Sequence, residues 1–162
     1  MSDFMFMLES RLTPIQSRVV AAVEAAAEDT DSQVFLAGGA LRDMLGGFPI
    51  MDLDFTIQGD AVGLARRLAS ATGAETLSTD NLRQTVELSF PGGQTVEIAM
   101  SRQEEYSPSG GRPKVTPAPI WEDLLRRDFS VNAIGLSLHP ASRGLLLDPA
   151  TAWPTSSGAS CG

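Results

Sequence analysis

The stretch from Gln33 to Gln58, which reads QVFLAGGALRDMLGGFPIMDLDFTIQ, decides the fold that this sequence predicts. A short apolar run leads into the glycine pair Gly38-Gly39 and a short helical pattern, after which the chain returns as an alternating strand from Asp52. Residues two apart in a strand point to the same face, so Asp52 and Asp54 are expected on one face and the apolar residues around them on the other. The pattern predicts two strands joined by a tight turn and a helix, with two carboxylates on the second strand.

The two carboxylates and the glycine pair together suggest a site for a metal ion and a phosphate, which neither feature suggests alone. Adjacent carboxylates with no basic neighbour repel each other, and Mg²⁺, which prefers hard oxygen ligands, relieves that repulsion. The glycine pair opens a helix whose first N–H groups suit a phosphate. A glycine pair before a helix is most often only a tight turn, and an isolated Asp-x-Asp is most often a polar strand edge. In this order and spacing they predict a nucleotidyl-transfer centre, and the glycines fit neither the P-loop nor the dinucleotide-binding pattern.

Two motifs resemble one known family. The stretch GGALRDMLGGFPIMDLDF is similar to the signature of the tRNA nucleotidyltransferase (CCA-adding enzyme) and poly(A) polymerase head domain, one of the polymerase-beta-like nucleotidyltransferases. A later stretch, EDLLRRDFSVNAIGL, resembles the RRDFxxNA motif of that family. The resemblance covers about residues 34–149. It implies an α/β (α+β) fold with a mixed, largely antiparallel sheet and helices mainly on one face.

The resemblance implies metal-dependent transfer of a nucleoside monophosphate from CTP or ATP to an RNA 3′ end, as in tRNA CCA addition or poly(A)-type addition. Asp52 and Asp54 would bind Mg²⁺, with two ions about 3.5–4 Å apart clamping the attacking and leaving oxygens. Glu97, on a strand beside them, would be the third catalytic carboxylate. The strand pattern alone leaves open a Glu97 that simply faces water.

The resemblance also implies where the nucleotide is held. Gly38, Gly39 and Arg42 would hold the triphosphate, and the RRD motif would hold the nucleotide through the forked geometry of arginine, mainly through Arg127. Two adjacent arginines also occur commonly on solvated surfaces, and this reading stays open beside the first. The further nucleotide-binding residues that the motif implies are Arg126, Asp128 and Asn132.

Composition restricts the class of protein. The 162 residues predict one domain, and a single cysteine, Cys161, leaves no disulfide framework. The net charge of −8 argues against a broad RNA-binding face, while eleven of the twelve basic residues are arginine, which suits local phosphate clamps. The N-terminal segment is unlike a signal peptide and no apolar run has the length of a membrane span, so a cytoplasmic protein without a membrane partner is expected.

The rest of the chain follows local rules. Helices are predicted over Thr13–Ala27 and Asp60–Thr72, each with a capping residue at its start. Arg83–Phe90 and Gln94–Met100 alternate around Pro-Gly-Gly and predict an antiparallel hairpin. Residues 101–119 are rich in proline and glycine and predict a long, mobile loop, after which another short helix is expected.

Three domain segments are expected: an N-terminal helix and lead-in over residues 1–32, the head domain over 33–149, and an irregular, disordered tail over 150–162. The family's neck, body and tail domains are not found in these residues. The tail reads ATAWPTSSGASCG, and GC-rich codons for it also encode a family-like helix start in another frame. This observation motivates the hypothesis of a frameshift and a truncated chain.

Two alternatives to an active RNA nucleotidyltransferase are consistent with these residues. One is a truncated remnant that binds nucleotide without transferring it. The other is a minimal nucleotidyltransferase that acts on a substrate other than RNA. A departure from the family pattern also stands at Arg83-Gln84-Thr85, because many members have glycine before the threonine.

Overall fold

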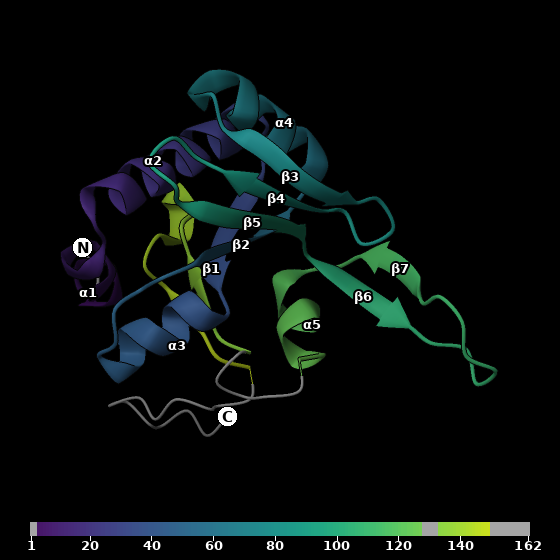
Figure 1. Ribbon diagram of the computed structural model, residues 1–162. Coiled ribbons are helices and arrows are strands. Elements are labelled where there is room, and N and C mark those ends of the chain that lie inside the picture. The colour runs from purple at the N-terminus through teal and green to yellow at the C-terminus, as the bar shows by residue number, and fades with distance from the viewer. Residues whose placement is uncertain (1–2, 128–132, 150–162) are drawn as a thin grey trace.

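The computed structural model describes residues 3–127 and 133–149, in which seven strands form one sheet in the order β3-β4-β5-β2-β1-β8-β9 (Figure 1). Neighbouring strands are antiparallel, apart from β2 and β5, which run parallel. The expected fold class, α/β (α+β) with a mixed, largely antiparallel sheet, is confirmed. The strands are β1 (Gln33–Ala37), β2 (Leu53–Gln58), β3 (Glu75–Asp80), β4 (Thr85–Ser89), β5 (Thr95–Met100), β8 (Gly135–Ser137) and β9 (Leu146–Leu147).

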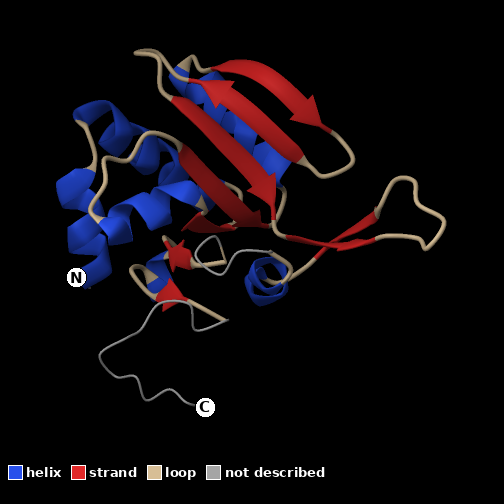
Figure 2. Ribbon diagram, turned by 60° about the horizontal axis from the view of Figure 1, so that its bottom comes forward, coloured by secondary structure: helices blue, strands red, loops and turns tan. Residues whose placement is uncertain are grey.

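Helices α2 and α4 lie against one face of this sheet (Figure 2). Both helices begin at the positions that their capping residues predicted. Thr13 forms a capping box with Gln16 at the start of α2, and Asp60 accepts a hydrogen bond from the Gly63 N–H at the start of α4. None of the helices in the described ranges combines the length and apolarity that a membrane crossing requires. The helices are α1 (Asp3–Arg11), α2 (Pro14–Asp29), α3 (Gly39–Gly46), α4 (Ala61–Thr72), α5 (Ile120–Leu125) and the 3-10 turn η2 (Pro140–Ser142).

Helix α1 is an element that the sequence pattern did not predict. It buries Met5 and Leu8 in the same core as the sheet and contacts α3. A helix of nine residues is marginal in isolation, so its stability comes from this packing rather than from a local signal.

The central strands separate an apolar face from a polar face. Phe55 and Ile98 are buried in the core together with Leu64 of α4, whereas Asp54 and Glu97 alternate with these apolar neighbours and lie on the opposite face. A second, smaller apolar cluster docks α5 beside the polar face, and it consists of Phe35, Ile120, Leu124 and Leu147. Thus α2 and α4 provide the core, while α5 alone among these three helices borders the polar side.

Residues 101–119 form a hairpin arm instead of the predicted long loop. Strands β6 (Arg102–Glu105) and β7 (Lys114–Pro117) pair antiparallel and project from the body (Figure 1). The loop prediction was wrong because most of the glycine and proline residues lie in the connection between the strands and after β7. The strands themselves are polar and show no apolar alternation. Side chains from distant parts of the chain support their pairing, and such contacts cannot be predicted from the local sequence pattern.

Three of the predictions lie outside the described residues. Asp128 and Asn132 of the RRD motif and the tail over residues 150–162 belong to the undescribed ranges. The arginines of the motif, Arg126 and Arg127, are described and directly follow α5.

Candidate functional site

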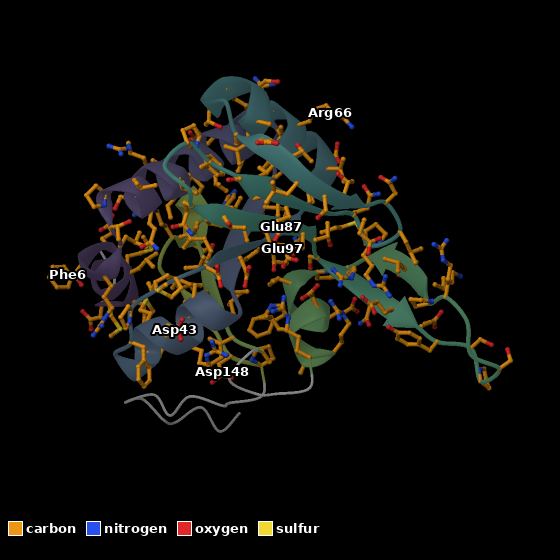
Figure 3. The ribbon with its side chains drawn as sticks, in the orientation of Figure 1. Phe6, Asp43, Arg66, Glu87, Glu97 and Asp148 are labelled. Atoms are coloured by element: carbon orange, nitrogen blue, oxygen red, sulfur yellow. The ribbon has the colours of Figure 1, made fainter. Side chains whose placement is uncertain are left out.

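Carboxylates from three neighbouring strands lie in one row across the polar face. Asp54 of β2 is the register partner of Glu97 of β5, and Glu97 is in turn the partner of Glu87 of β4. Partners in adjacent strands point to the same face, and Figure 3 shows Glu87 and Glu97 side by side at the centre of the sheet. Glu97 therefore has the position predicted for it, on a strand beside the Asp52-x-Asp54 strand. Its side chain is exposed on an open face rather than buried.

Asp54 carries the most perturbed charge of this row. The pKa of its carboxyl is raised to about 6, first by burial and then by the neighbouring charges of Glu97 and Asp52, while the charge of Arg127 opposes them. Asp52 precedes β2 and is exposed. A carboxylate that is half-buried among other carboxylates is the electrostatic condition that a bound cation relieves.

The glycine turn lies directly against this carboxylate. Gly38 precedes α3 with φ +71°, and a Cβ at that position would lie 3.2 Å from Asp54 Oδ2. The positive φ disfavours any other residue there, and a Cβ would also crowd the Asp54 carboxylate. No side chain caps the start of α3, and Arg42 folds back so that its Nη2 lies 3.2 Å from the place of a Cβ on Gly39. The structure thus brings Gly38, Gly39 and Arg42 to one helix N-terminus beside Asp54.

A cavity of about 270 Å³ on the polar face joins acidic and cationic side chains. Asp54 and Glu97, from the two parallel strands, line it together with Arg126 and Arg127, which follow α5. The predicted arginines are therefore brought to the predicted carboxylates, whereas Asp52, the glycine pair and Arg42 do not line this cavity. The remaining lining residues are Phe55, Thr56, Thr85, Ala99 and Arg102.

Arg102, Glu104 and Asp123 belong to this site and were not predicted. Asp123 is 1% exposed and accepts hydrogen bonds from Arg126 and Arg127. Glu104 is 8% exposed and accepts a hydrogen bond of 2.6 Å from Arg102. From the sequence, Asp123 was recognised only as an acidic residue in the first turn of a helix. Its spacing of three and four residues from the two arginines, which makes them neighbours on a helix, is the signal that could have found it.

The donor set suits Mg²⁺ that arrives with a nucleotide. Within the described residues, no group of three or more His, Cys, Asp or Glu side chains is placed to hold a metal ion by itself. Mg²⁺ is usually held by one or two carboxylates together with substrate phosphates rather than by a cage of protein ligands. Asp52 and Asp54 provide such a pair of hard oxygen donors, so the residues fit this ion.

Comparison with known proteins gives a consistent result. Residues 34–151 match the family model of the Poly A polymerase head domain. The A-adding tRNA nucleotidyltransferase of Halalkalibacterium halodurans is 38% identical over 118 residues, which are 72% of this chain and 27% of that protein. The CC-adding tRNA nucleotidyltransferase of Deinococcus radiodurans is 33% identical over 118 residues, which are 73% of this chain and 31% of that protein.

Solved structures with the same fold include CCA-adding enzymes. An apo form matches with a TM-score of 0.80 and 28% identity over 91% of this chain and 34% of its own. Others include a complex of the Thermotoga maritima enzyme with tRNA and complexes with CTP and with ATP. The chain spans about a third or less of the length of these relatives.

Proposed function

Because the chain belongs to the Poly A polymerase head domain family, we propose that its residues 33–149 form the catalytic head of an RNA nucleotidyltransferase. The reaction would transfer a nucleoside monophosphate from CTP or ATP to the 3′ hydroxyl of an RNA, with tRNA as the acceptor. The observation that carries this proposal is that Asp54 and Glu97 line one cavity together with Arg126 and Arg127. A nucleoside triphosphate with a divalent cation needs both kinds of group, close together.

The carboxylates would provide the metal-binding side of the reaction. Asp52 and Asp54 would hold Mg²⁺ against the phosphates of the nucleotide, and Glu97 would lie at the side of the attacking hydroxyl. Bound Mg²⁺ supplies charge neutralisation for the phosphates and lowers the pKa of a hydroxyl that it contacts. The raised pKa of Asp54 indicates that this carboxyl releases its proton at about pH 6 in the metal-free protein, so a bound cation would favour its charged form.

The arginines and the glycine turn would hold the nucleotide. Arg127 and Arg126 present forked guanidinium groups to the cavity, which match phosphate oxygens and sugar hydroxyls. The first N–H groups of α3, at Gly38 and Gly39, and Arg42 would hold the terminal phosphates. Asp128 and Asn132 would continue the arginine motif, although they lie outside the described residues. The protein thus contributes positioning and charge rather than covalent chemistry.

The names of the relatives support nucleotide and tRNA as the substrates. They divide between A-adding, CC-adding and CCA-adding enzymes, and solved relatives bind CTP, ATP and tRNA. The charged side chains that line the cavity are carboxylates and guanidiniums, which suit the metal ion and the phosphates that CTP and ATP have in common. This chain is therefore expected to bind CTP and ATP with similar affinity.

The test is a titration of Mg²⁺ and a fluorescent NTP analogue into the wild-type chain and into Asp52→Asn and Asp54→Asn. Both substitutions keep the shape of the side chain and remove a metal ligand, so Mg²⁺-dependent binding should be lost while the fold is kept. Glu75→Gln, on exposed β3, is the matched control and should bind as the wild type does. Unchanged binding in both aspartate variants would refute the metal assignment. Labelled ATP and a tRNA that lacks its terminal adenosine then separate a transferase from a protein that only binds nucleotide.

A further inference from the structure

We infer that Asp123 is a positioning residue that fixes the two arginines of the cavity in the orientation that a nucleotide requires. The inference rests on the proposed function and adds to it a residue that does not line the cavity. It depends on the burial of Asp123, on the hydrogen-bond partners of its two carboxylate oxygens, and on the further contact of one partner, Arg127, with β2.

Asp123 is a buried carboxylate whose oxygens are fully engaged. Its Oδ1 accepts from Arg127 Nε at 3.1 Å and from Arg127 Nη2 at 2.9 Å. Its Oδ2 accepts from the Arg102 backbone N–H at 2.9 Å and from Arg126 Nη2 at 3.3 Å. A carboxylate that is 1% exposed is costly to keep charged unless it is paired and hydrogen-bonded, and here both conditions are met. Since both oxygens are occupied, Asp123 acts on a substrate only through its partners.

The side-on contact with Arg127 determines the direction of that guanidinium. Two of its nitrogens bond one carboxylate oxygen, and Nη2 also donates to Thr56 Oγ1 of β2 at 3.3 Å. Thr56 lies two residues after Asp54 and on the same face of the strand, so Arg127 is held between α5 and the strand that carries the candidate metal ligand.

The scaffold around Asp123 is anchored to the same strand. The N–H of Ile120, at the start of α5, donates to Gln58 Oε1 at the end of β2 with a length of 2.8 Å. Asp123 itself ties α5 to the first residue of β6 through the Arg102 N–H. Helix α5 therefore cannot rotate about its axis without breaking contacts to both β2 and β6. This arrangement pre-organises Arg126 and Arg127, and pre-organisation lowers the cost of ordering them when a ligand binds.

The test compares Asp123→Asn with Glu122→Gln in the full chain. Asparagine keeps the shape of Asp123, but it removes the charge and places an amide N–H₂ against arginine donors. Glu122→Gln removes the same charge one residue earlier, from an exposed side chain. Affinities for Mg²⁺ with an ATP analogue, and for inorganic tripolyphosphate, are measured at a temperature where circular dichroism shows every variant folded. Asp123→Asn should weaken both ligands about tenfold or more and should lower kcat by up to about 10²-fold, because misplaced groups lose that much. Glu122→Gln should leave the two affinities and kcat unchanged.

A double-mutant cycle separates positioning from a merely structural role. If Asp123 acts through Arg127, adding Asp123→Asn to Arg127→Ala should cost much less affinity than Asp123→Asn costs alone. Additive losses would overturn the inference, and so would full affinity in a folded Asp123→Asn variant. If Asp123→Asn does not fold, Thr56→Val removes the contact of Arg127 with β2 and leaves Asp123 in place, and it should weaken tripolyphosphate binding several-fold. Wild-type affinity in Thr56→Val would then overturn the inference. A wild-type chain that binds no nucleotide would instead refute the proposed function itself, and the inference with it.

Discussion

At the scale of the residue, the carboxyl of Asp54 opposes folding at neutral pH, because the folded chain has to carry its charge half-buried beside other carboxylates. Its pKa is raised from 3.8 to about 6 by burial and then by Glu97 and Asp52, so the folded chain holds a proton that the unfolded chain releases. The contribution of this group to stability is fully present below pH 3.8. It is lost as the pH rises through about 6, because the folded state then has to carry the buried charge.

Removal of that charge should therefore stabilise the metal-free protein. Asp54→Asn is expected to raise the free energy of unfolding at pH 7.5 by about 1–3 kcal/mol relative to the wild type, and the gain should disappear near pH 4. Urea denaturation of both proteins at the two pH values measures it, with Glu75→Gln as the control for loss of one negative charge. A variant that is no more stable than the wild type at pH 7.5 would contradict the electrostatic account of this site.

Gln84 adopts a backbone conformation that glycine accommodates more easily. It lies in the turn before β4 with φ +54°, in the left-handed region that is unfavourable for a residue with a Cβ. Its side chain compensates in part, since Nε2 donates to the Asn81 carbonyl at 2.7 Å. The departure from the family pattern at Arg83-Gln84-Thr85 therefore costs conformational free energy but does not change the fold.

Gln84→Gly should stabilise the chain by about 0.5–1 kcal/mol, because relief of the left-handed strain exceeds the lost hydrogen bond and the added freedom of the unfolded chain. Gln84→Ala keeps the strain and loses the bond, so it should be less stable than the wild type. Thermal unfolding of the three proteins ranks them. If alanine and glycine prove equally stabilising, the strain at this position is not the cause.

At the scale of the element, a buried ionic cluster anchors the β6–β7 arm to the body. Burial alone would raise the pKa of Glu104, but hydrogen bonds from Arg102 and Tyr106 and the charge of Arg126 hold it below its ordinary value. Its Oε2 also lies 3.7 Å from Arg83 and 3.7 Å from Arg126, which come from the turn before β4 and from the end of α5. The arm is therefore positioned by charges from two other segments of the chain, the turn before β4 and the end of α5.

Glu104→Gln should loosen this arm more than it unfolds the domain, since it leaves three arginines without their shared carboxylate. Lys114 at the start of β7 is the only lysine of the sequence, so the protease Lys-C reports on this arm at a single site. The rate of cleavage there should rise in Glu104→Gln under native conditions. Glu105→Gln, which changes the exposed neighbouring residue, is the control. Equal cleavage rates in the two variants would show that Glu104 does not hold the arm.

At the scale of the whole molecule, the sheet assigns folding and chemistry to opposite faces. The apolar face packs on α2 and α4, and the polar face carries the cavity beside α5. A net charge of −8 coexists with a local concentration of arginines at the cavity, where three guanidinium groups line one site. Such a distribution favours capture of a small anionic ligand over contact with a long nucleic-acid backbone.

Features that depend on neighbours along the chain could be predicted without the structure. Capping at Thr13 and Asp60 set the starts of α2 and α4, the Pro-Gly-Gly turn set the β4–β5 hairpin, and alternation set which face of β2 carries Asp54. Periodicity, caps and turns act over a few residues, so a single sequence displays them. Motif resemblance added the arginines and Glu97 to the candidate site.

Only the tertiary structure decided which of these residues meet. The parallel register that sets Asp54 beside Glu97, and the bond from Arg127 to Thr56 across 71 positions of sequence, depend on how distant elements pack. Burial of Asp123 and the pairing of β6 with β7 are likewise outcomes of that packing, and neither shows an apolar pattern in the sequence. A polar residue is buried only when partners from elsewhere in the chain satisfy it, and those partners are defined in space rather than along the sequence.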